Sequence, residues 1–563
     1  MRLINAQTLE LEEYFGDQIP QYAILSHTWG SEELSFQEWQ GLRAPSHKSG
    51  YSKIKSACQQ ALKNDLKYLW CDTNCIDKSS STELSEAINS MFIWYKNSSV
   101  CYAYLEDVSR QDGDVISFMR KSRWFTRGWT LQELLAPGTV RFYGVNWETL
   151  GSRSDESSLI SSITGIPKYY LDTADISRAS IAEKMSWLAK RKTTRVEDMA
   201  YCMFGIFDLN LPLLYGEGSR AFVRLQEELV RVSNDHTIFC WDWLPGVVPR
   251  IWTSMLAPSP AAFEHSGHAQ EMIHNSRDIS TYSITNAGIN ISLQTVDACG
   301  FVFVVLNAVS SLETMDPAYH RLAIPLRRSK RGGFWERHSF PPSATTLPMA
   351  WASPMKPFYV GSRHATTWLE SPNYPFRRSG ILVTFDDRSL IELEDSIVEV
   401  EGHWDKLRSM FLLNAADLKV DRGVLGFKVM RSSRYGGPRK AKLLTIFFAV
   451  VTKESGDHEL HVRALDRQNY NDEKYLRQLT SEAANVGYYR SVESYSKEAD
   501  ATIITREYGQ FSFEGMVVKS VHIRLRKEKR APVEEYSIAD HARNTSTTSG
   551  KPRLGKQKRF LCF

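Results

Sequence analysis

Polar and aromatic side chains follow three apolar runs near the start of the chain, at residues 22–25, 68–71 and 100–105. They are Ser26, His27, Thr28 and Trp29 after the first run, Asp72, Asn74 and Asp77 after the second, and Glu106 and Asp107 after the third. Arg123 and Arg127 follow further along. Indole rings can stack a base, arginines can bind phosphate and carboxylates can bind ribose hydroxyls. The set indicates a nucleotide pocket, although core tryptophans and solvated strand ends would have the same composition.

Glu133 is the residue of this region best suited to catalysis. It follows Trp129 by four positions, which places both side chains on one face of a helix. A carboxylate beside an indole is partly desolvated, and a carboxylate can stabilise an oxocarbenium-like cation. An exposed helical Glu paired with Arg123 or Arg127 fits the same sequence. Glu83 and Glu86, in the preceding predicted helix, are weaker candidates for the catalytic role.

An α/β domain would bring these side chains together. The sequence predicts strands at residues 22–25, 68–71, 100–105 and 140–143, with helical stretches at 51–66, 82–97 and 115–135 between them. Strands that alternate with helices indicate a parallel, doubly wound sheet. Ligands of such sheets bind beyond the carboxyl ends of the strands, which is where the polar residues fall.

The rest of the chain divides into three regions. Residues 151–240 are predicted to be a helical extension, with a capping box at Ser180 and Glu183 and a helix at about 219–234. Residues 241–540 are predicted to be β-rich, because short alternating runs lie between turn residues. Those runs are 282–293, 301–309, 381–385, 443–452 and 517–525, with a less regular stretch at 310–375. Residues 541–563 are predicted to be a disordered basic tail.

Composition excludes several classes of protein. The 8 cysteines show no disulfide rhythm, and Cys71 and Cys75 lack the second pair that a zinc site needs. The first residues show no secretory signal, and the longest apolar runs are too short to span a bilayer. We therefore expect a cytoplasmic protein with no transmembrane segment and no bound metal.

Charge and motifs give no support for a nucleic-acid partner or for several enzyme classes. The net charge is +4, but the tail after residue 540 holds six basic residues and no acid, which leaves the preceding residues at −2. There is no phosphate-binding loop with a GK[ST] ending, no zinc-protease motif and no nucleophile elbow. A G-x-G-x-x-A at 216–221 has no preceding strand and is read as the start of a helix.

Four blocks of sequence resemble the heterokaryon incompatibility (HET) domain of filamentous fungi. They are YAILSHTWG at 22–30, YLWCDTNCID at 68–77, EAINSM at 86–91 and RGWTLQELLAP at 127–137. The resemblance covers about residues 1–150, and parts of 181–218 resemble the segment that often follows this domain. It implies a part in non-self recognition, a form of innate immunity, in which activation of the domain triggers programmed cell death. The nucleotide-binding module and WD repeats of some family members are not found in the sequence.

HET domains are distantly similar to Toll/interleukin-receptor (TIR) domains, which have a flavodoxin-like fold and in some members cleave NAD. The TIR enzyme motif W-x-x-x-E-[LI] fits Trp129 to Leu134. The resemblance thus implies that Glu133 is catalytic and that NAD, if used, is a substrate, with no cofactor required. The residues predicted to bind it are Ser26, His27, Trp29, Asp72, Asn74, Arg123, Arg127 and Trp129.

Two functions remain open from the sequence. The first is an NAD glycohydrolase of TIR type that triggers cell death. The second is a non-enzymatic signalling or scaffold module that self-associates through the HET domain. In either case the expected partners are further copies of the chain or other incompatibility proteins.

Overall fold

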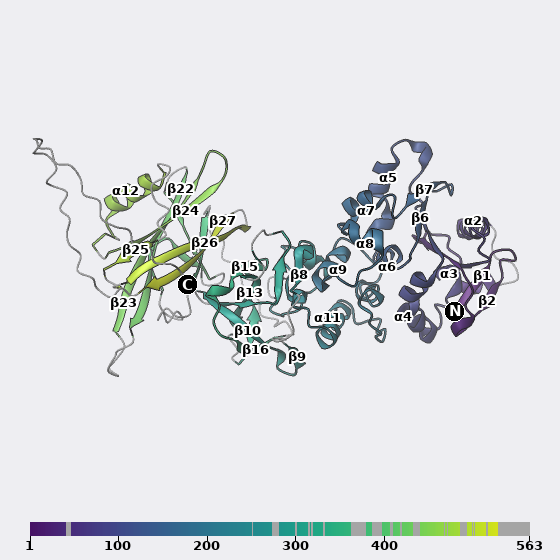
Figure 1. Ribbon diagram of the computed structural model, residues 1–563, viewed down its shortest axis with the longest axis horizontal. Helices are drawn as coiled ribbons and strands as arrows, with labels where there is room; N and C mark the ends of the chain where they lie inside the picture. Colours follow the sequence, from purple (N-terminus) through teal and green to yellow (C-terminus); the bar gives the residue numbers. More distant parts are fainter. Residues whose placement is uncertain are drawn as a thin grey trace, which may run out of the picture.

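The fold is described from a computed structural model, in which an α/β part, a helical part and a β-rich part follow one another along the long axis (Figure 1). The structure describes residues 1–526 apart from 41–46, 250–251, 273–280, 299–300, 313–315, 317–318, 330–332, 362–378, 386–396, 406–408, 417–418, 432–439, 467, 470, 485–492, 498, 500 and 514–515. The predicted basic tail at 541–563 lies outside the described residues.

The N-terminal part is built on a sheet in the order β2-β1-β4-β3-β5-β6-β7. Its strands are β1 (Arg2–Asn5), β2 (Leu11–Glu13), β3 (Ala23–His27), β4 (Tyr68–Trp70), β5 (Val100–Tyr104), β6 (Val140–Tyr143) and β7 (Thr149–Ser152). The four predicted strands, β4-β3-β5-β6, form a parallel centre, which confirms the α/β prediction. In chain order these four are arranged 2-1-3-4, as in flavodoxin-like sheets.

The central strands are long apolar runs because both of their faces are covered. Every residue of β3 and of β5 is buried, as expected for strands inside a parallel sheet. The sequence analysis did not predict β1, β2 and β7, which lie at the edges and pair antiparallel. Edge strands are short and only partly buried, so their apolar pattern is weak.

The helices of this part are α1 (Phe36–Gln40), α2 (Ser49–Lys63), α3 (Asp72–Cys75), α4 (Ser81–Asn97), α5 (Val115–Lys121) and α6 (Thr130–Leu135). The sequence predicts one helical region at 115–135, but the structure has two helices there, because a 3-10 turn at Arg123–Thr126 separates α5 from α6. Ser122 causes the break: its hydroxyl donates to Asp107 at 2.7 Å and accepts the backbone N–H of Trp124.

The helical extension packs onto the first part through a shared core. It contains α7 (Ser157–Thr164), α8 (Lys168–Thr173), α9 (Ile181–Leu188), α10 (Asp198–Tyr201) and α11 (Arg220–Val232). The predicted cap at α9 is confirmed, since the Ser180 hydroxyl accepts the Glu183 N–H at 3.1 Å. One cluster of buried apolar residues runs from Leu3 to Val360 without a break at residue 150. The sheet and the extension therefore share one hydrophobic core.

The β-rich part is confirmed as such and is mostly antiparallel. Its strands are β8 (Ala269–Glu271), β9 (Tyr282–Thr285), β10 (Gly288–Ala298), β11 (Phe301–Val305), β12 (Ala308–Ser310), β13 (His320–Arg328), β14 (Trp335–Arg337), β15 (Thr345–Pro348), β16 (Lys356–Val360), β17 (Ser379–Phe385), β18 (Ile397–Glu401), β19 (His403–Asp405), β20 (Met410–Leu412), β21 (Asn414–Ala415), β22 (Val420–Arg431), β23 (Lys440–Thr452), β24 (His458–Leu465), β25 (Glu493–Ser496), β26 (Ala501–Phe513) and β27 (Met516–Arg526). In the described residues they form sheets of 13, 5 and 2 strands.

Two features of this part were not predicted. The stretch expected to be less regular, 310–375, contains β13 to β16, where charged residues flank the apolar run of β13 and a proline interrupts it. A helix, α12 (Glu473–Ala484), packs on β22 and β23. Within the described ranges, no helix combines the length and the apolar character needed to cross a bilayer.

Substitution of Gly205 by alanine is expected to loosen the extension from α4. An added Cβ at this position would lie 2.0 Å from the Cβ of Phe92 on α4, so the two segments would have to separate. Overpacking of this kind costs about 1–3 kcal/mol, measurable as a lower midpoint of denaturant unfolding. Gly138→Ala is the control, because no atom lies within 4 Å of a Cβ there. Equal midpoints for the two variants would contradict the close packing.

Candidate functional site

A cavity of about 290 Å³ lies at the carboxyl ends of the parallel strands. One wall comes from the first part of the chain, through the end of β3 and the helices α3, α4 and α6. The opposite wall comes from the extension. The lining residues are His27, Trp29, Asp72, Ile76, Lys78, Leu84, Ile88, Met91, Tyr95, Arg127, Trp129, Thr130, Glu133, Lys192, Thr193, Thr194, Arg195, Asp198 and Tyr215.

Glu133 projects from the short helix α6 and is only 6% exposed. The hydroxyl of Ser26, in β3, donates a hydrogen bond to its Oε2. The same hydroxyl accepts the indole N–H of Trp124 at 2.8 Å. The hydrogen bonds from Trp124 to Ser26 and from Ser26 to Glu133 hold Oε2 of Glu133 in place. Glu133 itself lines the cavity.

Burial raises the pKa of Glu133 from 4.5 to about 7. The Ser26 hydrogen bond acts in the opposite direction, the nearby charge of Asp72 raises the pKa further, and Arg127 and Arg191 lower it. The carboxyl is therefore divided between its protonated and ionised forms near neutral pH. A titratable group poised in this way inside a cavity is characteristic of catalytic sites.

Trp29 and its neighbours form the outer edge of the cavity. The indole is 44% exposed, and its N–H donates to Asp72 Oδ2 at 3.0 Å. Lys78 Nζ lies 3.8 Å from the ring centroid and 3.6 Å from the Asp72 carboxylate. Arg127 reaches the same ring, with its Cζ at 5.6 Å from the centroid.

The extension supplies a second set of polar and aromatic groups. Trp129 donates its indole N–H to one oxygen of Asp198 at 3.4 Å, and the Tyr215 hydroxyl donates to the other at 2.9 Å. Arg195 lies over the Tyr215 ring, with Cζ at 4.3 Å from the centroid. Burial raises the pKa of Asp198, and the two hydrogen bonds partly offset this.

Backbone pairing holds the two walls together. The N–H of Lys192 donates to the carbonyl of Thr126 at 2.7 Å, and the N–H of Gly128 donates to the carbonyl of Lys192 at 2.9 Å. The buried guanidinium of Arg191 donates to the Arg127 carbonyl and to the Thr130 hydroxyl, each at 2.9 Å. Strand-like bonding between 126–128 and 192 therefore sets the width of the cavity.

His27 lies at the inner end of the cavity as a buried, neutral imidazole. Burial lowers its pKa, and the nearby ammonium of Lys53 adds to the effect. Its Nε2 lies 3.6 Å from Glu33 Oε2, and neither ring nitrogen has a hydrogen-bond partner in the described part of the chain. Both ring nitrogens are covered by neighbouring atoms, so His27 contributes to the shape of the cavity and not a nitrogen that a bound molecule could reach.

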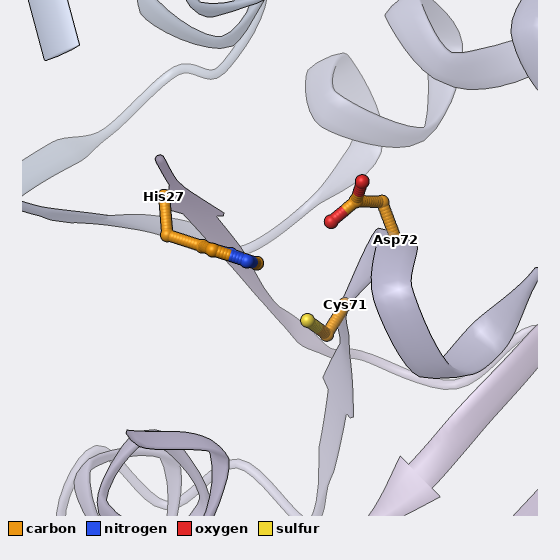
Figure 2. A group of neighbouring side chains, drawn as sticks. All are labelled: His27, Cys71 and Asp72. Carbon is orange, nitrogen blue, oxygen red and sulfur yellow. The ribbon is translucent and has the colours of Figure 1, made fainter. Parts of the chain in front are cut away.

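His27, Cys71 and Asp72 are the one group of described residues with a metal-ligating combination, and Figure 2 shows their polar atoms facing one another. One potential ligand atom from each lies within 4.8 Å of the others. The chemistry of the donors does not favour a cation, however. Asp72 already binds Trp29 and faces the Lys78 ammonium, and burial raises the pKa of the Cys71 thiol to about 12. We therefore assign no metal to this group: His27 and Asp72 line the cavity, and Cys71 is fully buried beside them.

The structure brings most of the predicted site residues together. Six line the cavity, namely His27, Trp29, Asp72, Arg127, Trp129 and Glu133, and Ser26 lies behind Glu133. Two lie elsewhere. Asn74 is buried against the Leu34 carbonyl at 3.2 Å, and Arg123, 64% exposed in its side chain, faces Glu106 at 3.4 Å.

Residues that the sequence analysis missed come mainly from the extension. They are Lys78, Lys192, Arg195, Asp198 and Tyr215. Asp198 and Tyr215 fall in segments that resemble the sequence following HET domains, and this resemblance was the available signal. Their distance from Glu133 along the chain gave no indication that the two segments meet.

Comparison with known proteins supports the sequence resemblance. The family model described as "Heterokaryon incompatibility protein (HET)" matches residues 22–117. The vegetative incompatibility protein HET-E-1 of Podospora anserina is 49% identical over 221 residues, which is 38% of this chain and 16% of that protein. The chain thus spans a small fraction of the length of this curated relative. No solved structure matches.

Replacement of Glu133 by glutamine is expected to change the pH dependence of stability. Because the folded-state pKa is raised from 4.5 to about 7, the folded protein holds this proton more tightly than the unfolded chain does. The stabilising contribution is fully present below about pH 4.5 and is lost as the pH rises through about 7. Glutamine at position 133 does not ionise, so the variant does not lose this stability as the pH rises. Its amide oxygen can still accept the hydrogen bond from Ser26.

The variant should therefore gain up to about 3 kcal/mol relative to the wild type between about pH 5 and about pH 8. The measurement is the free energy of unfolding in denaturant at both pH values. A difference between variant and wild type that does not change with pH would show that Glu133 titrates normally.

Proposed function

Because the chain contains a HET domain, we propose that it acts in heterokaryon incompatibility, where it triggers programmed cell death by cleaving NAD. The similar Podospora protein is a vegetative incompatibility protein, and this supports the biological role. The observation that carries the chemistry is the buried Glu133 carboxyl, with its pKa raised to about 7, in the wall of a cavity that also contains indole rings and cations.

Cleavage of NAD⁺ breaks the bond between the anomeric carbon of a ribose and the pyridinium nitrogen. The electron pair of that bond stays with nitrogen, so nicotinamide leaves neutral and the ribose becomes an oxocarbenium ion. Water then attacks the anomeric carbon and loses a proton, giving ADP-ribose. The ionised Glu133 stabilises the cation through its negative charge, which acts strongly because the carboxylate is desolvated.

The other residues of the cavity orient the substrate. Ser26 fixes one oxygen of Glu133, so that the carboxylate does not have to reorient as positive charge develops. Lys78 already lies over the ring of Trp29, and we therefore assign the stacking of a substrate ring to Trp129.

The test is to incubate the purified protein with NAD and to measure free nicotinamide. Glu133→Gln should lower kcat at least about 100-fold, because it removes the charge that stabilises the transition state. Glu86→Gln, on the exposed side of α4, is the matched control and should retain activity. Unchanged cleavage in Glu133→Gln would exclude this carboxylate. A wild-type protein that self-associates and is toxic without NAD loss would favour the scaffold function.

The pH profile gives an independent prediction. Since the carboxylate is the active form, kcat/KM should rise with pH through an apparent pKa near 7. The hydrogen bond from Ser26 lowers the pKa of Glu133, so Ser26→Ala should move the rising limb to higher pH. The measurement is kcat/KM for NAD across the pH range. A profile that does not move in Ser26→Ala would mean that another group controls it.

A further inference from the structure

Three cations face the cavity and form no salt bridge to a carboxylate in the described part of the chain. They are Arg127, which precedes α6, and Lys192 and Arg195, which lie in the loop between α9 and α10. Other cations nearby are paired: Lys78 lies 3.6 Å from Asp72, and Lys190 lies 3.3 Å from Glu264 on the surface. The cavity thus holds unpaired positive charge.

The acidic residues of the cavity interact with these cations only at longer range: the charge of Arg195 lowers the pKa of Asp198, and that of Arg127 lowers the pKa of Glu133. Both oxygens of Asp198 accept hydrogen bonds from Trp129 and Tyr215, and Asp72 is engaged by Trp29 and Lys78. Glu133 is only partly ionised near neutral pH, because its pKa is raised to about 7. Unpaired cations that line a cavity favour an anionic ligand.

The two loop cations are held in place relative to Arg127. The backbones of Arg127 and Lys192 are bridged in parallel, so their side chains start from neighbouring positions. Arg195 is oriented by Tyr215, over whose ring its guanidinium lies. Thr194 adds a hydroxyl group to the same stretch of wall, and the hydroxyl of Thr193 donates to the carbonyl of Arg195. Lysine, arginine and hydroxyl side chains together are suited to phosphate oxygens.

We propose that Lys192 and Arg195, together with Arg127, bind the diphosphate of a dinucleotide or of ADP-ribose. This inference rests on the proposed function for the identity of the ligand. It adds that the phosphate subsite lies beyond the matched range 22–117, because Arg127, Lys192 and Arg195 all follow it. Glu133 also follows that range, so the matched segment contains neither the proposed catalytic carboxylate nor the cations of the subsite.

The experiment measures binding separately from cleavage. In the full chain carrying Glu133→Gln, which prevents turnover, calorimetry gives the Kd of ADP-ribose and of adenosine, which has no phosphate. Adding Lys192→Ala and Arg195→Ala together should weaken ADP-ribose binding at least about tenfold and change adenosine binding by less than about twofold. Lys190→Ala is the matched control, since this neighbouring side chain is 76% exposed and pairs with Glu264.

Two further variants test whether weaker binding is caused by loss of charge or by loss of the fold. Lys192→Gln removes the charge but keeps the backbone bonds to Thr126 and Gly128, and Arg195→Lys keeps the charge at its position. The first should weaken ADP-ribose binding and the second should largely retain it. The inference would be overturned if the variants weakened the binding of ADP-ribose and adenosine equally, or left ADP-ribose binding unchanged. It would also be overturned if the Glu133→Gln protein with Lys192 and Arg195 intact did not bind ADP-ribose.

The two proposals fail in different ways. If Glu133→Gln abolishes NAD cleavage but the Lys192 and Arg195 variants leave the KM for NAD unchanged, the phosphate subsite is wrong and the proposed chemistry stands. If the protein does not cleave NAD but the same variants lose ADP-ribose selectively, the subsite stands and the cavity is a binding site for the nucleotide.

Discussion

The backbone pairing of Lys192 with the segment from Thr126 to Gly128 is the contact on which the cavity depends. It fastens the extension to the turn that precedes α6, and so fixes the distance between the two walls. The pairing requires glycine at 128, because a Cβ there would lie 2.5 Å from the Cγ2 of Thr193. Arg191 strengthens the junction by bonding to the carbonyl of Arg127 and to Thr130 from the interior.

The junction also determines the electrostatics of Glu133. With the extension in place, α6 is fully buried and the carboxyl loses its water. A buried carboxylate without a partner is costly, and here the cost is limited by one hydrogen bond from Ser26 and by the more distant charges of Arg127 and Arg191. The result is a group that is neither firmly ionised nor firmly neutral. The raised pKa of Glu133 therefore depends more on the packing of the extension against α6 than on α6 itself.

The sequence was sufficient to predict the central strands and one wall of the cavity. The strands β3 to β6 are mostly apolar and buried, and the polar residues at their ends meet because parallel strands end at one edge. Asn74 did not follow this logic: it lies in the turn of helix α3 and faces inward. Arg123 lies one position after the serine that ends the preceding helix, so it points to solvent. The opposite wall could not be predicted, since no local pattern shows that residues 192–215 lie beside residue 133.

A cavity assembled from distant segments has a consequence for the order of events during synthesis. The residues that line it run from His27 to Tyr215, and the buried core beneath it continues to Val360. A growing polypeptide on the ribosome that has completed the sheet still lacks the wall that the extension supplies. A chain with a harmful activity in this cavity would therefore stay inert until the extension had emerged and folded back.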